Sequence, residues 1–146
     1  MELKIKRLHH NAVIPRYATS GSACFDLHNI DEEDKMVMEG NPLVFRTGLA
    51  FEIPKDHVML VFSRSGHGFN SDVRLANCVG VIDSDYRDEV KVKLSNDPSL
   101  KWGGFLVRQY DRIAQAMVIP VEQVKFVLCD ELSVTERFGG LGSTGA

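Results

Sequence analysis

The chain has 146 residues, of which 44% are hydrophobic and 25% charged, and its formal net charge is −3. These proportions are typical of a globular domain of ordinary size, one that buries about two-thirds of its unfolded surface. A mildly acidic chain lacks the broad positive field that a nucleic-acid backbone requires, so any anion site must be built locally from a few cations.

Short strand signals separated by turn residues run through the chain. Hydrophobic alternation and β-branched runs predict strands over residues 3–6, 36–38, 43–53, 57–62, 90–94, 105–107, 113–121 and 124–129. Helix is expected for one or two turns near residues 68–72. Many short strands at this spacing predict an all-β sandwich or barrel. We find no internal repeat or linker, so one domain is expected over 1–146, with a β core over 1–132 and a detachable arm over 133–146.

Targeting and redox signals favour a reducing, cytoplasmic location. No apolar run approaches the roughly 20 residues that span a bilayer, and the N-terminal residues lack the apolar core of a signal peptide. The three cysteines are widely spaced and form no CxxC pair. We therefore expect them to be small hydrophobic residues rather than disulfide partners or metal ligands.

The stretch from Gly80 to Val90 concentrates polar groups at one hairpin. Asp83, Asp85 and Tyr86 follow an apolar approach, and residues 90–94 then alternate strictly between apolar and lysine side chains. Such a hairpin could combine a base for water, a flat ring for a sugar and exposed backbone amides. The alternative is that the two carboxylates only cap the turn. The hairpin alone leaves both interpretations open.

Three further segments favour phosphate binding. Arg64-Ser65-Gly66 follows the apolar run 58–62, placing a guanidinium, a hydroxyl and an approachable amide at a strand end. Asp111 to Gln115 opens another apolar strand. The last eight residues hold four of the twelve glycines, so this tail is expected to be a flexible arm that wraps phosphates with arginine, hydroxyls and bare amides.

Together with residues 22–27, these segments resemble the five ordered motifs of the trimeric dUTP diphosphatases (dUTPases). The matched segments are 22–27, 64–66, 77–90, 111–115 and 137–145. The resemblance implies a jelly-roll-like β-barrel, a homotrimer with sites shared between subunits, and hydrolysis of dUTP to dUMP and pyrophosphate. That activity would supply dUMP for thymidylate synthesis and keep uracil out of DNA. No membrane and no direct nucleic-acid partner is expected.

The resemblance also implies roles for individual residues. Asp83 would activate the water that attacks the α-phosphate, and Tyr86 would pack on the deoxyribose and exclude a ribose 2′-hydroxyl. Uracil would be recognised by the hairpin backbone, at Val81, Ile82, Asp83 and Lys91, with Asn77 in support.

The triphosphate would be held from two directions. Arg64, Ser65, the Gly66 amide and Gln115 would form a cradle, and the arm of another subunit would add Arg137, Leu141, Gly142, Ser143 and Thr144. Mg²⁺ would be bound mainly by the triphosphate and water, with Asp26 in its outer shell. Arg112 would pair with a carboxylate such as Asp26.

The chain departs from the family pattern at four positions. Leu141 stands where an aromatic ring usually covers the uracil, and Arg137 lies one residue closer to the glycine pair. Asp88 and Tyr110 stand where glycine is common, so either residue would be strained if its turn requires a positive φ.

Other interpretations remain beside this one. A relative of the dCTP deaminases would share the fold, although the Asp83-x-Asp85-Tyr86 pattern argues against it. A regulatory trimer could instead bind a protein through the acidic loop 31–34 or the segment 96–104. The glycine pattern over 140–145 is not expected to be a dinucleotide motif, because such a motif lies between a first strand and a helix.

Overall fold

The computed structural model describes residues 1–97, 103–136 and 139. Its elements, in chain order, are β1 (Lys4–Arg7), β2 (Phe25–His28), β3 (Lys35–Val37), β4 (Leu43–Arg46), β5 (Leu49–Glu52), β6 (His57–Phe62), α1 (Ser65–Ser71), β7 (Val73–Leu75), β8 (Val79–Ile82), β9 (Lys91–Asn96), β10 (Phe105–Val107) and β11 (Arg112–Pro120). The all-β prediction is confirmed, and α1 is the one helix of the described ranges. It is too short to cross a membrane.

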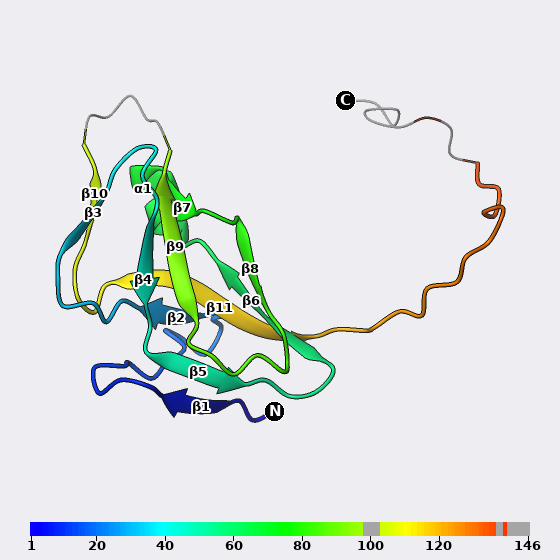
Figure 1. Cartoon of the computed structure of the whole chain (residues 1–146), viewed down its shortest axis with the longest axis horizontal. Helices are drawn as coiled ribbons and strands as arrows, with labels where there is room; N and C mark the ends of the chain where they lie inside the picture. The colour runs from blue at the N-terminus through cyan, green and yellow to red at the C-terminus, as the bar shows by residue number, and fades with distance from the viewer. Residues whose placement is uncertain (98–102, 137–138, 140–146) are drawn as a thin grey trace.

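The strands form two larger sheets and two strand pairs (Figure 1). The four-stranded sheet has the order β2-β11-β6-β8, and the three-stranded sheet has the order β4-β9-β7. The remaining pairs are β1-β5 and β10-β3. Every pairing among these strands is antiparallel. In the four-stranded sheet β8 lies at an edge, so half of its backbone groups have no neighbouring strand among the described residues.

The core lies between the sheets and follows the predicted alternation. On β9, Val92 and Leu94 are buried, whereas Lys91 and Lys93 point outward. Other strands contribute large buried side chains such as Phe45, Leu27, Leu49, Met59 and Ile113. A two-residue period buries one face of each strand, and this burial supplies the main free energy that stabilises the fold.

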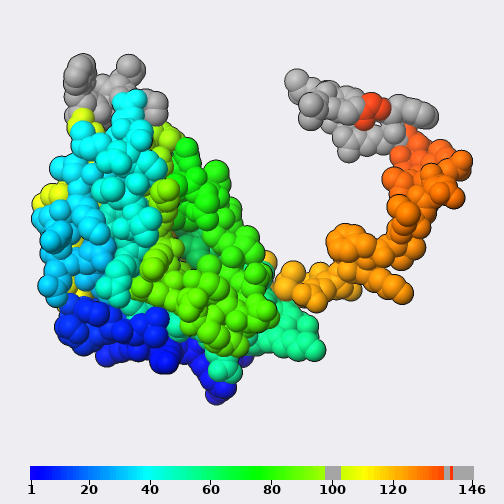
Figure 2. All heavy atoms as spheres, in the orientation of Figure 1, coloured from blue at the N-terminus to red at the C-terminus, as the bar shows by residue number. Residues whose placement is uncertain are grey.

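Two sequence-based expectations need correction. The helix begins at Ser65 rather than near Gly68, so it contains the Ser65-Gly66 pair. The strand expected over 124–129 does not form, and residues 121–136 leave the body as an extended segment with exposed side chains (Figures 1 and 2). A strand needs a partner for its backbone groups, and within the described chain residues 124–129 have none. The division of the chain into a β core over 1–132 and an arm over 133–146 stays a prediction.

Candidate active site

The first pocket, which we call the arginine pocket, lies at the ends of three neighbouring strands. It has a volume of about 310 Å³ and is lined by Ala18, Ser22, Ala23, Cys24, Asp26, Arg64, Ser65, Gly66 and Gln115. Asp26 comes from β2, Gln115 from β11, and the Arg64-Ser65-Gly66 segment from the junction of β6 with α1. The fold thus brings three of the sequence segments together.

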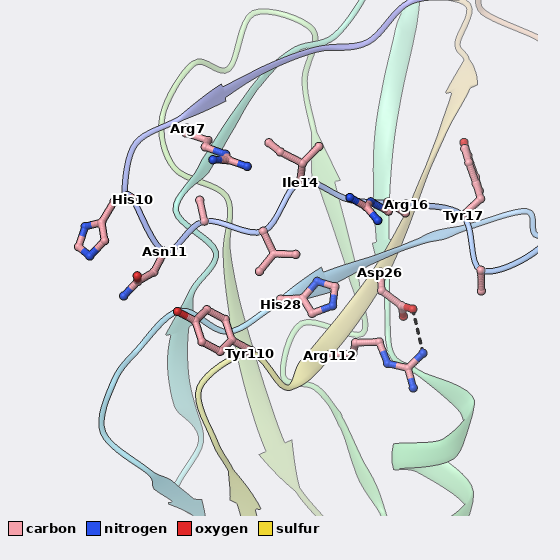
Figure 3. A pocket seen from close by; sticks show the side chains of 13 residues that line it. Arg7, His10, Asn11, Ile14, Arg16, Tyr17, Asp26, His28, Tyr110 and Arg112 are labelled. Atoms are coloured by element: carbon pink, nitrogen blue, oxygen red, sulfur yellow. Dashed lines mark hydrogen bonds and ion pairs between the residues drawn. The ribbon is translucent and has the colours of Figure 1, made fainter.

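Asp26 binds two arginine side chains at this pocket. Its Oδ1 accepts a hydrogen bond from Arg64 Nε at 3.1 Å, and its Oδ2 accepts one from Arg112 Nη1 at 3.3 Å. The carboxylate side chain is 20% exposed, so partial burial strengthens both ion pairs. The predicted pair between Arg112 and Asp26 is confirmed (Figure 3). The pair between Arg64 and Asp26 was not predicted.

Gln115 and Cys24 complete the lining of the arginine pocket. Gln115 Nε2 donates to the Ser63 carbonyl at 2.9 Å, which leaves its amide oxygen available to a ligand. Burial, and to a lesser extent the negative charge of Asp26, raises the pKa of the Cys24 thiol. A thiol kept protonated is a poor nucleophile, so the pocket does not offer a thiolate.

The second pocket, which we call the strand-edge pocket, lies beside β8. It has a volume of about 160 Å³ and is lined by Val61, Leu75, Asn77, Gly80, Val81, Ile82, Lys91, Val92 and Lys93. Four predicted site residues, Asn77, Val81, Ile82 and Lys91, are therefore together. Because β8 is an edge strand, its outer N–H and C=O groups can bind a small planar ligand.

The turn after β8 holds the other two hairpin residues. Asp83 is exposed, and its carbonyl accepts a hydrogen bond from the Tyr86 amide at 3.2 Å. The Tyr86 hydroxyl donates to the Glu89 carbonyl at 3.2 Å, while the residue is 40% exposed. This bond orients the ring and leaves it open to a ligand. Neither Asp83 nor Tyr86 lines the strand-edge pocket or the arginine pocket.

The two pockets share no lining residue. One copy of the described chain therefore presents a basic anion pocket and a separate strand-edge pocket. Arg137, Leu141, Gly142, Ser143 and Thr144, the predicted arm residues, lie outside the described residues.

A third and larger pocket lies on the other side of Asp26. It has a volume of about 570 Å³, and its charged and aromatic lining includes Arg7, Arg16, Tyr17, His28, Tyr110 and Arg112 (Figure 3). Asp26 lines both this pocket and the arginine pocket. The carboxylate thus lies between the two pockets and binds Arg64 of one and Arg112 of the other.

The two positions where the family commonly has glycine, Asp88 and Tyr110, differ in backbone conformation. Tyr110 adopts a left-handed conformation with φ of 66°, whereas Asp88 does not have a positive φ. The Tyr110 amide donates to the Asn29 carbonyl at 2.7 Å, which helps to hold the residue there. Such a backbone costs a non-glycine residue roughly 1–2 kcal/mol. The turn strain that the sequence raised is therefore present at Tyr110 and absent at Asp88.

Sequence reasoning missed two residues near these sites. His67 on α1 lies 3.1 Å, through Nε2, from Arg64 Nη1. Glu89 binds the backbone of the β4–β5 turn through its side chain. His67 follows the matched arginine segment directly, but its contact depends on how α1 packs, and Glu89 reaches a turn 41 residues away. Neither contact has a sequence signal of its own.

An antiparallel β fold with an arginine pocket and a strand-edge pocket defines a protein suited to bind an anionic ligand with a planar part. The family model described as dUTPase matches residues 10–145. The chain belongs to the dUTPase family.

Named relatives match along almost the whole chain. The deoxyuridine 5′-triphosphate nucleotidohydrolase of Nautilia profundicola is 44% identical over 146 residues, covering 99% of each chain. The protein of the same name from Helicobacter pylori is 38% identical over 146 residues, covering 99% of this chain and 97% of its own.

Solved structures show the same fold. A mutant dUTPase of Staphylococcus bacteriophage 80alpha with dUpNHpp has a TM-score of 0.84 at 23% identity, and 99% of each chain is covered. A mutant dUTPase from phage phi11 of S. aureus, described with a structural Mg(II) ion, has a TM-score of 0.80 at 20% identity. That match covers 92% of this chain and 100% of the phage protein.

Proposed function

We propose that this chain is a dUTP diphosphatase, which hydrolyses dUTP to dUMP and pyrophosphate. Membership of the dUTPase family supports the activity. The observation that carries the proposal is the pairing of an arginine pocket with a strand-edge hairpin that presents Asp83 and Tyr86. A triphosphate fits the first feature, and a deoxyuridine fits the second.

We propose a homotrimer as the active form, with a jelly-roll-like barrel in each subunit. One chain keeps its two pockets separate, and no residue lines both. Residues 121–136 expose large apolar side chains, including Phe126 at 91% and Leu128 at 99%. Exposed apolar surface of this kind is typical of a protein interface. Assembly would cover these side chains and bring the two kinds of pocket together.

Uracil binds at the edge of β8. Those N–H and C=O groups of the Val81-Ile82 segment that face away from β6 complement the donors and acceptors of uracil, whose pattern differs from that of cytosine. Tyr86 covers the deoxyribose, where a ribose hydroxyl would collide with the ring. A close fit around the base at the strand-edge pocket would exclude the additional methyl group of thymine.

The arginine pocket holds the phosphates. Arg64 supplies a guanidinium, Ser65 and Gly66 supply a hydroxyl and an amide, and the Gln115 carboxamide lines the opposite wall. The arm residues Arg137, Leu141, Gly142, Ser143 and Thr144 close over the nucleotide from another subunit. Leucine at 141 gives the uracil apolar cover in place of an aromatic ring.

The residues of the arginine pocket fit a Mg²⁺ ion that the protein holds only through metal-bound water. The described chain contains no group of three or more His, Cys, Asp or Glu side chains placed to bind a metal. Asp26 uses one lone pair on each oxygen for Arg64 and Arg112, so its remaining lone pairs can accept hydrogen bonds from metal-bound water. When bound, Mg²⁺ neutralises charge on the triphosphate.

The reaction needs one water and one base. The Asp83 carboxylate removes a proton as the water oxygen attacks the α-phosphorus, and the bond to the bridging oxygen of the β-phosphate breaks. Pyrophosphate leaves with the electron pair of that bond, and dUMP remains. The cationic groups around the phosphates stabilise the charge that moves to the leaving group.

This activity would supply dUMP for thymidylate synthesis and remove a source of uracil in DNA. A reducing, cytoplasmic location remains our proposal, supported by Cys24, Cys78 and Cys129, which are free thiols.

The decisive experiment measures pyrophosphate release from dUTP, dCTP, dTTP and UTP side by side. We expect Asp83→Asn to lower kcat for dUTP by at least about 100-fold with little change in nucleotide binding, because the amide keeps the shape but not the basicity. Asp85→Asn in the same turn is the matched control, and its loss should be several-fold at most. Equal losses in the two variants would show that Asp83 is not the base. Release of ammonia from dCTP, measured in parallel, would favour the deaminase interpretation.

A further inference from the structure

His67 makes a side-chain contact with the arginine of the arginine pocket. Its Nε2 lies 3.1 Å from Arg64 Nη1. A guanidinium nitrogen can only donate, so Nε2 must accept this hydrogen bond. The imidazole is therefore neutral in this arrangement and carries its proton on Nδ1.

The surroundings of His67 favour the neutral ring. The imidazole packs on Phe105 with ring centroids 4.8 Å apart, and its Nδ1 is buried without a partner among the described residues. Burial is the largest cause that lowers the pKa of His67, and the charges of Arg64 and Arg112 lower it further. Asp111 and Asp26 oppose this effect.

Arg64 is held by three acceptors on three elements. Nε donates to Asp26 Oδ1 at 3.1 Å, and Nη1 donates both to His67 Nε2 at 3.1 Å and to the Arg112 carbonyl at 3.3 Å. These bonds use every hydrogen on Nε and Nη1. In the described part of the chain Nη2 has no partner, so both of its hydrogens are available to a ligand.

We propose that His67 is a positioning residue that orients Arg64 for the triphosphate by accepting its Nη1 hydrogen. The inference rests on the proposed function and deepens it. Asp26 and the Arg112 carbonyl restrain the guanidinium on one side, and His67 restrains it from α1. Without the imidazole acceptor, Nη1 loses one of its two partners and can rotate or turn toward solvent.

The contact also makes the arginine pocket sensitive to the protonation state of His67. Protonation of His67 places a hydrogen on Nε2, so two donors and two positive charges face each other. The bond is then lost, and Arg64 is repelled from its position. Substrate use should therefore decline as the pH falls through the lowered pKa of His67.

Two variants separate positioning from packing. His67→Phe keeps a ring against Phe105 but has no acceptor, whereas His67→Gln offers an amide oxygen that does not titrate. We expect His67→Phe to lower kcat/KM for dUTP about tenfold, the effect of losing one hydrogen bond to a charged group. His67→Gln should stay within about threefold of wild type at neutral pH. His57→Gln, at a histidine that lines neither of the two pockets, is the control and should match wild type.

The pH profile is the readout that a packing role would not change. Between about pH 7 and about pH 5, wild type should lose a component of kcat/KM that His67→Gln retains. Wild-type kinetics in a folded His67→Phe variant, or the same acidic decline in His67→Gln, would overturn the proposal. If His67→Phe fails to fold, the profile of His67→Gln decides.

A measurement on the wild-type chain separates this inference from the proposed function. Imidazole ¹⁵N NMR at neutral pH should show His67 protonated at Nδ1 and bare at Nε2. A proton on Nε2 would refute the contact even in an active enzyme. A chain that leaves dUTP intact would refute the proposed function, while the NMR spectrum would still decide whether His67 accepts from Arg64.

Discussion

Tyr86 shows how a single side chain is oriented before any ligand binds. Its amide donates to the Asp83 carbonyl and its hydroxyl to the Glu89 carbonyl, each at 3.2 Å. Two bonds at opposite ends of the residue restrain the ring, and the residue as a whole remains 40% exposed. A ring held in this way can exclude a substituent by steric contact, because it cannot move aside without losing a hydrogen bond.

We expect Tyr86→Ala to reduce the preference for dUTP over UTP by about tenfold or more, because the surface that excludes the 2′-hydroxyl is removed. Tyr86→Phe keeps the ring and loses only the bond to Glu89, so it should retain most of the preference. Steady-state kinetics on both nucleotides measure the ratio. A parallel loss for dUTP and UTP in Tyr86→Ala would mean that the ring only packs.

At the scale of elements, the loop between β8 and β9 is tied to the other sheet. Glu89 Oε1 accepts from the Gly48 amide at 2.8 Å, and Oε2 accepts from Arg46 Nε at 3.3 Å. The Glu89 side chain is only 13% exposed. The next residue, Val90, donates its amide to the Leu49 carbonyl at 2.9 Å. These contacts hold the base of the loop that carries Asp83 and Tyr86.

Glu89→Ala should lower the free energy of unfolding by about 2 kcal/mol, because the Gly48 amide would lose its acceptor. Glu89→Gln keeps an acceptor and should lose less. Glu52→Ala is the surface control: its partner Lys4 is exposed, so stability should change little. Urea unfolding of the three variants tests the order, and equal losses for Glu89→Ala and Glu52→Ala would contradict it.

At the scale of the whole molecule, two features of the described chain concern assembly. Its pockets are separate, and residues 121–136 leave the body as an extended segment (Figure 2). The exposed apolar side chains of this segment include Val124, Phe126, Leu128, Leu132 and Val134. Both features are expected of one subunit of an assembly. In the proposed trimer, a second copy would cover the apolar segment.

Two truncations test this assembly. A chain ending at Glu136 keeps the apolar segment, so it should remain a trimer while its turnover falls at least about 100-fold for lack of the arm. A chain ending at Pro120 should fail to form the trimer, because the exposed apolar side chains are gone. Light scattering and dUTP hydrolysis report the two properties. A trimer from the Pro120 chain, or full activity without the arm, would contradict the respective part of the proposal.

The sequence predicted most strands and the family correctly. Alternation along residues 90–94 predicted which face of β9 is buried, because the side-chain period of a strand is a local property. The pairing of Arg112 with Asp26 was also predicted, from the family resemblance. The strand expected at 124–129 was wrong for the described chain, since strand propensity cannot say whether a partner is present.

The sequence by itself determined the all-β class, the family and the segments that carry polar groups, because these depend on residue types and their spacing. Only the tertiary structure decided which of those groups meet. Arg64 binds a carboxylate 38 residues earlier, and Glu89 binds a turn 41 residues earlier. His67 accepts from Arg64 because α1 turns its ring onto Phe105 and toward the guanidinium. Contacts of this kind follow from the packing of distant elements, which residue spacing does not specify.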